Sequence, residues 1–551
     1  MSALTELHDS VRTAAAAVAG GAEGAAVEKA TLERPKQADH GDFATNAAMV
    51  LTKALKRPPR EIAADLAQRL QDDLGAVLDR VDIAGPGFLN VVLADAWFTG
   101  ALGSVLEAGD GFGAGGADPP RKVNVEFVSA NPTGPLHVGH TRNAAYGDAL
   151  ARIFEMRGHQ VSREFYVNDY GSQIVKLATS VQARARGQEP PEDGYQGDYV
   201  TELARQVDGA DGEDLDAIGA AAVQVMLRSA AESLERFGVH HDIWFSERSL
   251  HEPAEGATGS AVDHAFDVLA EQGRTYEQDG ALWLRTTEFG DDKDRVLRRS
   301  SGEHTYFASD IAYHQNKLER GFEVLCDVWG ADHHGYVPRM HAAFRALGGA
   351  AEDLDLLIMQ FVNLKNGDDL TSMSKRAGTL VTLDDLVGAI GVDAARWFLL
   401  ARSHDTRVDL DLAVAREQSS ENPVYYVQYA HARIASVLRD VGPERVASAL
   451  AEVDSSVALG TALHASERDL LKLVLEFPDV LAEAEERRAP HRLTTYALEL
   501  AQAFSAFYRD CRVKDAEPAG LKSYRIALCV VTRRTLARAL GLLGVSAPDQ
   551  M

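Results

Sequence analysis

The sequence predicts an α/β protein with a parallel central sheet, an α+β module before it and an all-helical segment after it. An apolar run at residues 123–128 is followed by a turn, a helical stretch and a second β-rich run at residues 161–167. This strand–helix–strand order is the unit from which parallel sheets are built. Residues 1–112 mix helical and strand patterns, and from about residue 415 the periodicity is almost entirely helical. A chain of 551 residues is long enough to form several domains.

Composition limits the class of protein. Hydrophobic residues make up 46% and charged residues 25% of the chain, which is typical of a soluble globular protein. The net charge of −26 argues against a protein coated in nucleic acid, although a local basic surface remains compatible with it. The sequence has no signal peptide and no apolar run long enough to cross a membrane, so we expect no membrane partner. Three widely separated cysteines suit neither a Cys-x-x-Cys zinc site nor a disulfide framework, so we expect a cytoplasmic protein without bound zinc; they are Cys326, Cys511 and Cys529.

The first 112 residues predict a module of helices and strands. An Ala-rich amphipathic stretch at residues 2–18 predicts a helix, and residues 40–46 predict a turn that leads into a second helix. Residues 85–93 predict a turn and then a strand, and the Gly-rich stretch at 109–120 predicts a linker. A basic cluster near the end of the second helix is by itself typical of a solvated helix end; it comprises Lys53, Lys56, Arg57 and Arg60.

The helix after the first central strand is expected to bind a phosphate. Its start carries unpaired backbone N–H groups and the positive end of the helix dipole, where phosphates bind readily. His137 and His140 are three residues apart, so they share one face of the first turn. Imidazoles donate hydrogen bonds to phosphoryl oxygens, and Gly139 between them lets a flat ring approach the backbone. A lone histidine here is more often a cap or a solvated side chain, but this pattern favours a nucleotide site. Gly158 is placed to end the helix.

These residues carry a resemblance to a known family. His-Val-Gly-His at residues 137–140 resembles the His-Ile-Gly-His signature of class I aminoacyl-tRNA synthetases. The longer string at residues 126–140, Glu-Phe-Val-Ser-Ala-Asn-Pro-Thr-Gly-Pro-Leu-His-Val-Gly-His, resembles the arginyl-tRNA synthetases in particular, and the resemblance extends over most of the chain.

The resemblance implies three domains. Residues 1–112 would be an N-terminal α+β module that contacts tRNA, supported by Gly-Asp-Phe-Ala-Thr-Asn at residues 41–46. Residues 113–414 would form a Rossmann-type catalytic domain with a helical insertion at about 180–265. Residues 415–551 would form an all-helical anticodon-binding domain.

A second motif lies at residues 371–379, Thr-Ser-Met-Ser-Lys-Arg-Ala-Gly-Thr, and resembles the Lys-Met-Ser-Lys-Ser signature of the same class. The match is partial, because Ser372 and Arg376 replace its first lysine and last serine, but Lys375 is retained. A cation in a loop before a helix suits a clamp on triphosphate. Thr382 opens a capping-box pattern for the next helix, and Lys122 would add positive charge near the histidines. The resemblance implies catalysis by His137, His140 and Lys375, and ATP binding by His137, Gly139, His140, Gly330, Met373, Ser374 and Lys375.

The arginine site is expected around Asp310. Tyr306 and Asp310 are four residues apart and share a helix face. An arginine guanidinium is a planar fork that matches a carboxylate and an aromatic face. From the sequence alone a surface or capping aspartate would be the default, and the resemblance implies that this pair holds the guanidinium. A divalent metal at residues 332–334 is an alternative to polar substrate contacts there, and His240-His241 favours a strand edge over a metal site. The implied arginine-binding residues are Glu126, Ser129, Asn131, Tyr306, Asp310 and Asp332.

The helical segment interleaves aromatic and basic residues between residues 504 and 514. Aromatic rings stack on unpaired bases while Arg and Lys hold phosphates, although a bundle core with charged edges accounts for most of the apolar residues. Candidate tRNA-binding residues are Tyr429, Arg433, Arg509 and Arg512.

The resemblance implies an ATP-dependent arginine–tRNA ligase. Arginine would attack the α-phosphate of Mg-ATP to give arginyl-adenylate and pyrophosphate, and the arginyl group would then pass to tRNA(Arg) with release of AMP. The family needs bound tRNA before activation, and we expect this here, with the enzyme as a monomer. Three rivals remain: a cysteinyl-tRNA synthetase, which normally carries a zinc-binding Cys/His set; a nucleotidyltransferase, which is usually far shorter; and a catalytically inactive RNA-binding paralogue.

Overall fold

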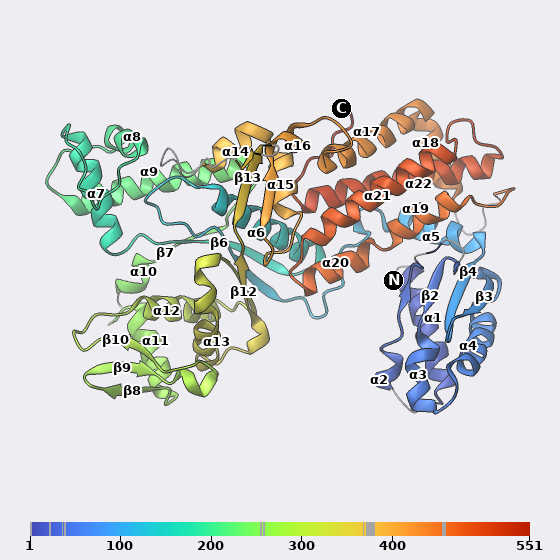
Figure 1. The fold of residues 1–551 in the computed structure, drawn as a ribbon, viewed down its shortest axis with the longest axis horizontal. Coiled ribbons are helices and arrows are strands. Elements are labelled where there is room, and N and C mark those ends of the chain that lie inside the picture. The colour runs from blue at the N-terminus through green and yellow to red at the C-terminus, as the bar shows by residue number, and fades with distance from the viewer. Residues whose placement is uncertain are drawn as a thin grey trace.

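A parallel sheet forms the centre of the molecule (Figure 1). The computed structural model describes residues 3–20, 24–35, 37, 40–253, 256, 259–366, 369–370, 381–453 and 459–551. Within these residues the sheet has five strands in the order β12–β11–β5–β6–β7, namely β5 (Lys122–Glu126), β6 (Gln160–Val167), β7 (Ile243–Ser246), β11 (Val324–Gly330) and β12 (Leu354–Met359). All neighbouring pairs are parallel, so the carboxyl ends of the strands meet at one edge. The order reverses at β5, and in open α/β sheets that reversal marks the crevice where ligands bind. The predicted parallel α/β core is confirmed.

Helix α6 (Val138–Arg157) packs directly on this sheet. Gly147 lets it lie close, because a Cβ there would stand only 2.2 Å from Cγ of Phe127. The helix ends at Arg157, and Gly158 follows with a φ of 103°, as the sequence predicted.

Between β6 and β7 the chain leaves the sheet and forms helices with a hydrophobic core of their own, α7 (Ser172–Ala185), α8 (Asp198–Gln206) and α9 (Leu215–Arg236). These helices overlap the helical insertion that the sequence predicts at about 180–265, and residues 243–246 return to the main sheet as strand β7. The reason is apolar packing, since Trp244 stacks on Phe165 of β6 with ring centroids 4.4 Å apart.

After β7 a second layer of helices and strands gathers beside the carboxyl edge (Figure 1). A small antiparallel sheet, which the sequence analysis did not predict, has the order β10–β9–β8 in the described part of the chain. Its strands are β8 (Thr275–Gln278), β9 (Ala281–Leu284) and β10 (Arg295–Arg298). The helices are α10 (Arg248–His251), α11 (Ala261–Glu271), α12 (Tyr306–Glu319) and α13 (Val337–Ala346).

The N-terminal module is the predicted α+β unit. Its antiparallel sheet has the order β1–β2–β4–β3, with strands β1 (Leu32–Glu33), β2 (Phe43–Thr45), β3 (Leu78–Ala84) and β4 (Phe88–Leu93). Helices accompany it, namely α1 (Ala3–Val18), α2 (Gly24–Val27), α3 (Ala47–Leu55), α4 (Pro59–Leu74) and α5 (Asp95–Ala108). The Gly-rich stretch that follows is anchored, because Phe112 packs against Phe477 with ring centroids 6.2 Å apart.

The C-terminal part is helical, as predicted. A short mixed sheet and three helices lead into it: β13 (Val362–Asn366), β14 (Asp369–Leu370), β15 (Val408–Asp411), α14 (Leu383–Ile390), α15 (Val392–Leu400) and α16 (Leu412–Arg416). The bundle itself comprises α17 (Pro423–Val441), α18 (Pro443–Glu452), α19 (Ala465–Leu475), α20 (Phe477–Glu486), α21 (His491–Asp510) and α22 (Ala519–Leu542). Helices α17, α21 and α22 pack on one another. None of the described helices is both long and apolar enough to span a membrane.

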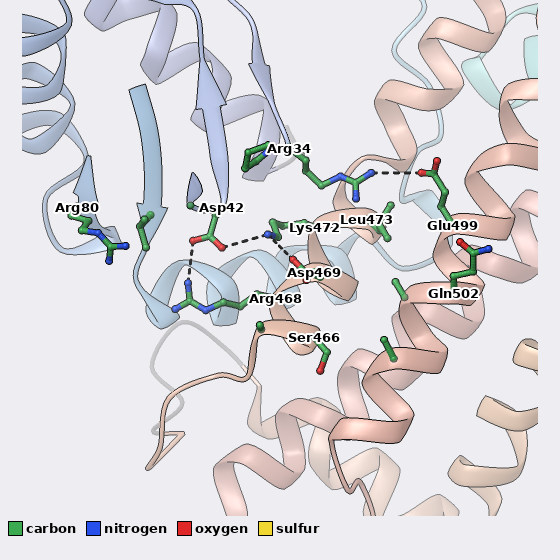
Figure 2. A pocket seen from close by; sticks show the side chains of 16 residues that line it. Arg34, Asp42, Arg80, Ser466, Arg468, Asp469, Lys472, Leu473, Glu499 and Gln502 are labelled. Atoms are coloured by element: carbon green, nitrogen blue, oxygen red, sulfur yellow. Dashed lines mark hydrogen bonds and ion pairs between the residues drawn. The ribbon is translucent and has the colours of Figure 1, made fainter. Parts of the chain in front are cut away.

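The N-terminal module docks on the bundle through ion pairs. The carboxylate of Asp42 forms ion pairs with Arg468 at 3.0 Å and Lys472 at 3.5 Å. Arg468 also forms an ion pair with Asp95 at 2.6 Å. Figure 2 shows Asp42 between the two cations, at the rim of a cavity of about 710 Å³ between module and bundle. These contacts hold the two parts of the chain together on one side of the cavity.

Candidate active site

The two predicted histidines stand at the start of α6, beyond the carboxyl end of β5. Nδ1 of His137 accepts a hydrogen bond of 3.1 Å from the backbone N–H of Gly139. Nδ1 of His140 accepts one of 3.3 Å from the backbone N–H of His137. The rings stack, with centroids 3.7 Å apart and planes 24° from parallel. The imidazoles form one unit at a helix N-terminus, where the backbone also favours an anion.

Both imidazoles are neutral at neutral pH. Burial lowers the pKa of His140 to about 3, helped by the neighbouring His137, and burial also lowers the pKa of His137. Because each Nδ1 accepts a hydrogen bond, the ring proton resides on Nε2. Gly139 is required by this arrangement, since a Cβ at that position would lie 2.9 Å from Cε1 of His137. The pair therefore offers two N–H donors that suit phosphoryl oxygens.

The turn between β5 and α6 is strained. Val128 has a φ of 73° and Ser129 a φ of 40°, a region that non-glycine residues rarely adopt. The Ser129 hydroxyl donates to Oε1 of Glu126 at 2.8 Å and accepts from the backbone N–H of Tyr166 at 3.1 Å. Asn131 lies exposed on the same turn. The strain thus falls where three of the predicted arginine-binding residues are positioned.

The second predicted motif, with Met373, Ser374 and Lys375, lies outside the described residues. The chain that follows it is held against the histidine turn. The backbone N–H of Val138 donates to the carbonyl oxygen of Val381 at 3.0 Å, and that of Leu383 donates to Leu136 at 2.8 Å.

Two other sequence expectations concern the flanks of these motifs. Thr382 and Asp385 form the predicted capping box of α14. Lys122 does not lie near the histidines. It starts β5, at the opposite edge of the sheet, and donates to the carbonyl oxygen of Arg320 at 2.6 Å.

Asp310 lies one turn into α12, and the hydroxyl of Tyr336 donates a hydrogen bond to its Oδ2. Burial raises the pKa of Asp310 to about 6; the Tyr336 hydrogen bond and His314 oppose the shift, while Glu247 and Glu126 add to it. No described lysine or arginine forms an ion pair with this carboxylate. Tyr306, at the first position of α12, is 82% exposed. The site thus presents a half-buried carboxylate that has no lysine or arginine partner in the described part of the chain.

Glu126 belongs to a buried network behind Asp310. Nζ of Lys317 donates to Oε2 of Glu126 at 2.7 Å and to Oδ1 of Asp327 at 2.8 Å, and His314 lies 3.0 Å from Asp327. Burial raises the pKa of Glu126 even though Lys317 acts against it. Burial by itself raises the pKa of Asp327, but the positive charge of Lys317 opposes burial, and the pKa is lowered to about 2. Lys317 therefore holds both carboxylates in place, at the ends of β5 and along β11.

Gly330 ends β11, and Asp332, His333 and His334 follow in a 3₁₀ turn at Ala331–Tyr336. The side chain of Asp332 is 79% exposed, with Oδ2 at 3.5 Å from Nε2 of His333. Among the residues that the structure describes, no three His, Cys, Asp or Glu side chains are placed to hold a metal ion. His241 is buried, with its ring 4.3 Å from that of Phe127.

Sequence reasoning missed four side chains of the site, namely Tyr166 and Glu247, which act electrostatically with Asp310, Lys317, which pairs with Glu126, and Tyr336, which donates to Asp310. The first two had a usable signal, because Tyr166 lies near the end of β6 and Glu247 directly follows β7, at the edge where ligands bind. The other two had none. Lys317 and Tyr336 meet their partners across long stretches of sequence, which no local pattern reveals.

The predicted RNA-facing residues fall into two groups. The guanidinium of Arg433 lies 4.8 Å from the ring centroid of Tyr429 and 5.1 Å from that of Tyr508, and Tyr425 stacks on Tyr429. Tyr429 and Tyr508 are each 41% exposed, so this cluster presents aromatic faces and a cation at the surface of α17 and α21. Arg509, the residue after Tyr508, pairs with Asp510 at 2.8 Å, and Arg512 is exposed. Phe504 and Phe507 are buried core residues.

Comparison with known proteins covers nearly the whole chain. The family described as "Arginyl tRNA synthetase N terminal domain" matches residues 5–93, "tRNA synthetases class I (R), catalytic domain" matches 113–434, and "DALR anticodon binding domain" matches 427–551. An Arginine--tRNA ligase of Oceanobacillus iheyensis is 44% identical over 94% of both chains. One from Nitratidesulfovibrio vulgaris is 46% identical over 95% of this chain and 96% of its own. The structure of Thermus thermophilus arginyl-tRNA synthetase superimposes with a TM-score of 0.77 over 99% of this chain and all of the other, at 24% identity, which supports the fold.

Proposed function

The chain belongs to the arginyl-tRNA synthetases of class I, and on that premise we propose how its residues carry the reaction. As a member of this family it is an arginine–tRNA ligase that uses ATP to join L-arginine to tRNA through an arginyl-adenylate, releasing AMP and pyrophosphate. The enzyme's task is to position the reactants and stabilise charge, since the chemistry needs no covalent protein intermediate.

Asp310 binds the guanidinium of the substrate. The observation that carries this proposal is a half-buried carboxylate with a raised pKa and no described lysine or arginine as partner. Such a group is costly unless a cation arrives, and an arginine side chain supplies both the charge and the planar donor pair. Tyr336 orients the carboxylate through its hydrogen bond to Oδ2.

The remaining arginine contacts lie around the strained turn and the end of β11. Glu126 is fixed by Lys317 and Ser129, so it serves as an oriented acceptor at the carboxyl end of β5. Its neighbours on the turn and the exposed groups across the crevice complete the set; they are Ser129, Asn131, Tyr306 and Asp332. Tyr306 and Asp332 are exposed, so their side chains are accessible to a substrate in the crevice.

The nucleotide binds at the start of α6. The Nε2–H groups of His137 and His140 donate to phosphoryl oxygens, and Gly139 and Gly330 leave room for the adenosine. Lys375, together with Met373 and Ser374 of the same motif, binds the triphosphate. Its positive charge stabilises the negative charge that develops as pyrophosphate leaves. Magnesium enters on the substrate as Mg-ATP, and no zinc is required.

Three units of the chain serve the tRNA and the chemistry. Residues 1–112 contact the tRNA, residues 113–414 carry the active site, and residues 415–551 bind the anticodon through Tyr429, Arg433, Arg509 and Arg512. The exposed ring–guanidinium cluster on α17 and α21 supports the last point. We place the enzyme in the cytoplasm, in keeping with its three buried free thiols, and as a monomer, which light scattering would test.

The assignment of Asp310 is tested by Asp310→Asn, which keeps the shape and removes the charge. The measurement is ATP–pyrophosphate exchange in the presence of tRNA. At arginine concentrations that saturate the parent enzyme, arginine should no longer stimulate exchange by the variant. Calorimetric binding of arginine should weaken by roughly 100-fold, as for loss of a charge-assisted bidentate contact. Asp193→Asn is the control for loss of one exposed charge, because Asp193 lies between α7 and α8 with its side chain 73% exposed. Unchanged arginine affinity in Asp310→Asn would place the guanidinium elsewhere.

A further inference from the structure

His314 is a buried histidine whose two ring nitrogens both face hydrogen-bond acceptors. It lies on α12, one turn after Asp310, and only 2% of its surface is exposed. Its Nδ1 lies 2.8 Å from the backbone carbonyl oxygen of Asp310, and its Nε2 lies 3.0 Å from Oδ2 of Asp327. A carbonyl oxygen has no proton to donate, so Nδ1 of His314 carries one. The charge of the ring therefore depends on whether Asp327 is ionised.

Lys317 holds Asp327 as a carboxylate. Nζ of Lys317 donates to Oδ1 of Asp327 at 2.8 Å and to Oε2 of Glu126 at 2.7 Å, and the lysine side chain is completely buried. Burial by itself lowers the pKa of Lys317, but the two carboxylates oppose burial, and the pKa ends above its ordinary value. An ionised carboxylate only accepts hydrogen bonds, so Nε2 of His314 carries a proton as well.

We infer that His314 is an imidazolium at neutral pH, and that its positive charge keeps Asp310 ionised for the guanidinium of the substrate. The inference deepens the proposed function and rests on it. His314 is a positioning residue, because its ring contacts the backbone of Asp310 and does not occupy the side-chain oxygens. Those oxygens remain available to Tyr336 and to the substrate.

The charge balance of this buried cluster supports two protons on the ring. Glu126 and Asp327 contribute two negative charges, and Lys317 together with an imidazolium contributes two positive charges. A neutral His314 would leave one excess negative charge beside Asp310, whose pKa burial already raises. Buried charges are costly unless they are paired. The titratable groups that face Asp310 from other elements are tyrosines and acids, namely Tyr166, Tyr336, Glu126 and Glu247.

The ring of His314 also faces α13. Phe344 of that helix packs against it with ring centroids 6.4 Å apart, and the ring of Tyr313 lies at 5.9 Å. His341 of α13 is neutral at neutral pH, because burial and then the charge of Arg345 lower the pKa of His341. The imidazole of His314 therefore meets a carboxylate on the β11 side and neutral rings on the α13 side.

The first test compares arginine binding by His314→Gln and by the parent across pH, using calorimetry on the full chain. Without the cation, the pKa of Asp310 should rise by roughly one unit, so the variant should bind arginine about fivefold more weakly at about pH 6. At about pH 8 the carboxylate is ionised in both proteins. There the variant should bind arginine as tightly as the parent or more tightly, because no imidazolium repels the guanidinium.

His264→Gln is the matched control. His264 lies on α11 with its side chain 57% exposed, and it pairs with Glu319 at 2.8 Å. The control should follow the parent at every pH. Coincident profiles for His314→Gln and the parent would overturn the inference. An equal loss of affinity at both pH values would also overturn it, because that is the result of structural damage alone.

The second test observes the ring protons directly by nuclear magnetic resonance of the full chain with isotope-labelled histidine nitrogens. At about pH 8 ordinary histidines, with a pKa of about 6.5, are neutral and carry one ring proton. We expect one doubly protonated ring that His264→Gln retains and His314→Gln lacks. If His314→Gln does not fold, Asp327→Asn identifies the signal, because the ring then loses the carboxylate that holds its second proton. A single ring proton on His314 would overturn the inference.

The variant Asp310→Asn keeps the two proposals distinguishable. If it binds arginine as the parent does, the proposed site fails, and the role of His314 fails with it even though its ring stays doubly protonated. If Asp310→Asn loses arginine while His314→Gln and the parent have coincident pH profiles, only the role of His314 fails.

Discussion

Arg396 of α15 and Asp148 of α6 form an ion pair of 2.5 Å in which both side chains are almost completely buried. Arg396 also donates to the carbonyl oxygens of Leu543 at 2.7 Å and Phe237 at 3.3 Å. Gly544 makes room for it, because a Cβ there would lie 2.3 Å from the guanidinium. One side chain thus joins the helix that starts with the histidines, the end of α9 and the chain after α22.

Arg396→Met should destabilise the protein by about 3 kcal/mol, because it strands the buried carboxylate of Asp148. Urea unfolding followed by fluorescence measures the change. Arg236→Met is the control. Arg236 forms an exposed pair with Asp384 at 3.0 Å, and removing it should cost less than about 1 kcal/mol. Equal losses in the two variants would show that burial adds nothing to the Arg396 pair.

Arginine affinity should fall as the pH drops below about 6. The pKa of Asp310 is raised to about 6, so the free enzyme loses the carboxylate charge on acidification and must expel a proton to bind a cation. Each pH unit below that value should weaken arginine about tenfold. Calorimetry across this range measures it, and Asp310→Asn should show no such dependence. Constant affinity at lower pH would contradict the role of Asp310 as an ionised acceptor.

His140→Asn should lower the rate of arginine activation by roughly 100-fold while arginine affinity stays near that of the parent, because the imidazole acts on the phosphates. Single-turnover exchange with bound tRNA measures the rate, and calorimetry the affinity.

The parent rate at saturating arginine should show no ionisation of His140 near neutral pH, since burial lowers the pKa of His140 to about 3. A rate that falls with a midpoint near the ordinary histidine value would contradict the neutral pair.

Tyr429→Ala should raise the KM for tRNA, because a base-stacking aromatic contributes about 1–3 kcal/mol per base. Arginine binding should not change. Tyr276→Ala is a matched control: Tyr276 is stacked against Arg285 at 4.7 Å, on the small sheet of β8 to β10, remote from α17 (Figure 1). Aminoacylation kinetics at several tRNA concentrations compare the two. An equal effect of both variants would remove the case for a base at the α17 cluster.

The sequence predicted features that local physics determines. The helix stop at Gly158 and the capping box at Thr382 need only a few neighbouring residues, and both are confirmed. The strand at β7 was assigned to an insertion because its short apolar run carries no information on which strand it pairs with. Tyr336 beside Asp310 was beyond reach, since the two are 26 residues apart on different elements. Lys122 shows the same limit. It is close to the histidines in sequence, but strand β5 begins at Lys122 and the histidines lie beyond its other end.

The hydrogen bonds from backbone N–H groups to Nδ1 of His137 and His140 have a consequence for how the enzyme meets ATP. They select one tautomer of each ring when the chain folds, long before any nucleotide arrives. The donors are therefore preorganised, and the entropy of aligning them is lost during folding instead of in the transition state. A disturbance confined to the first turn of α6 would then slow adenylate formation with both imidazoles still present.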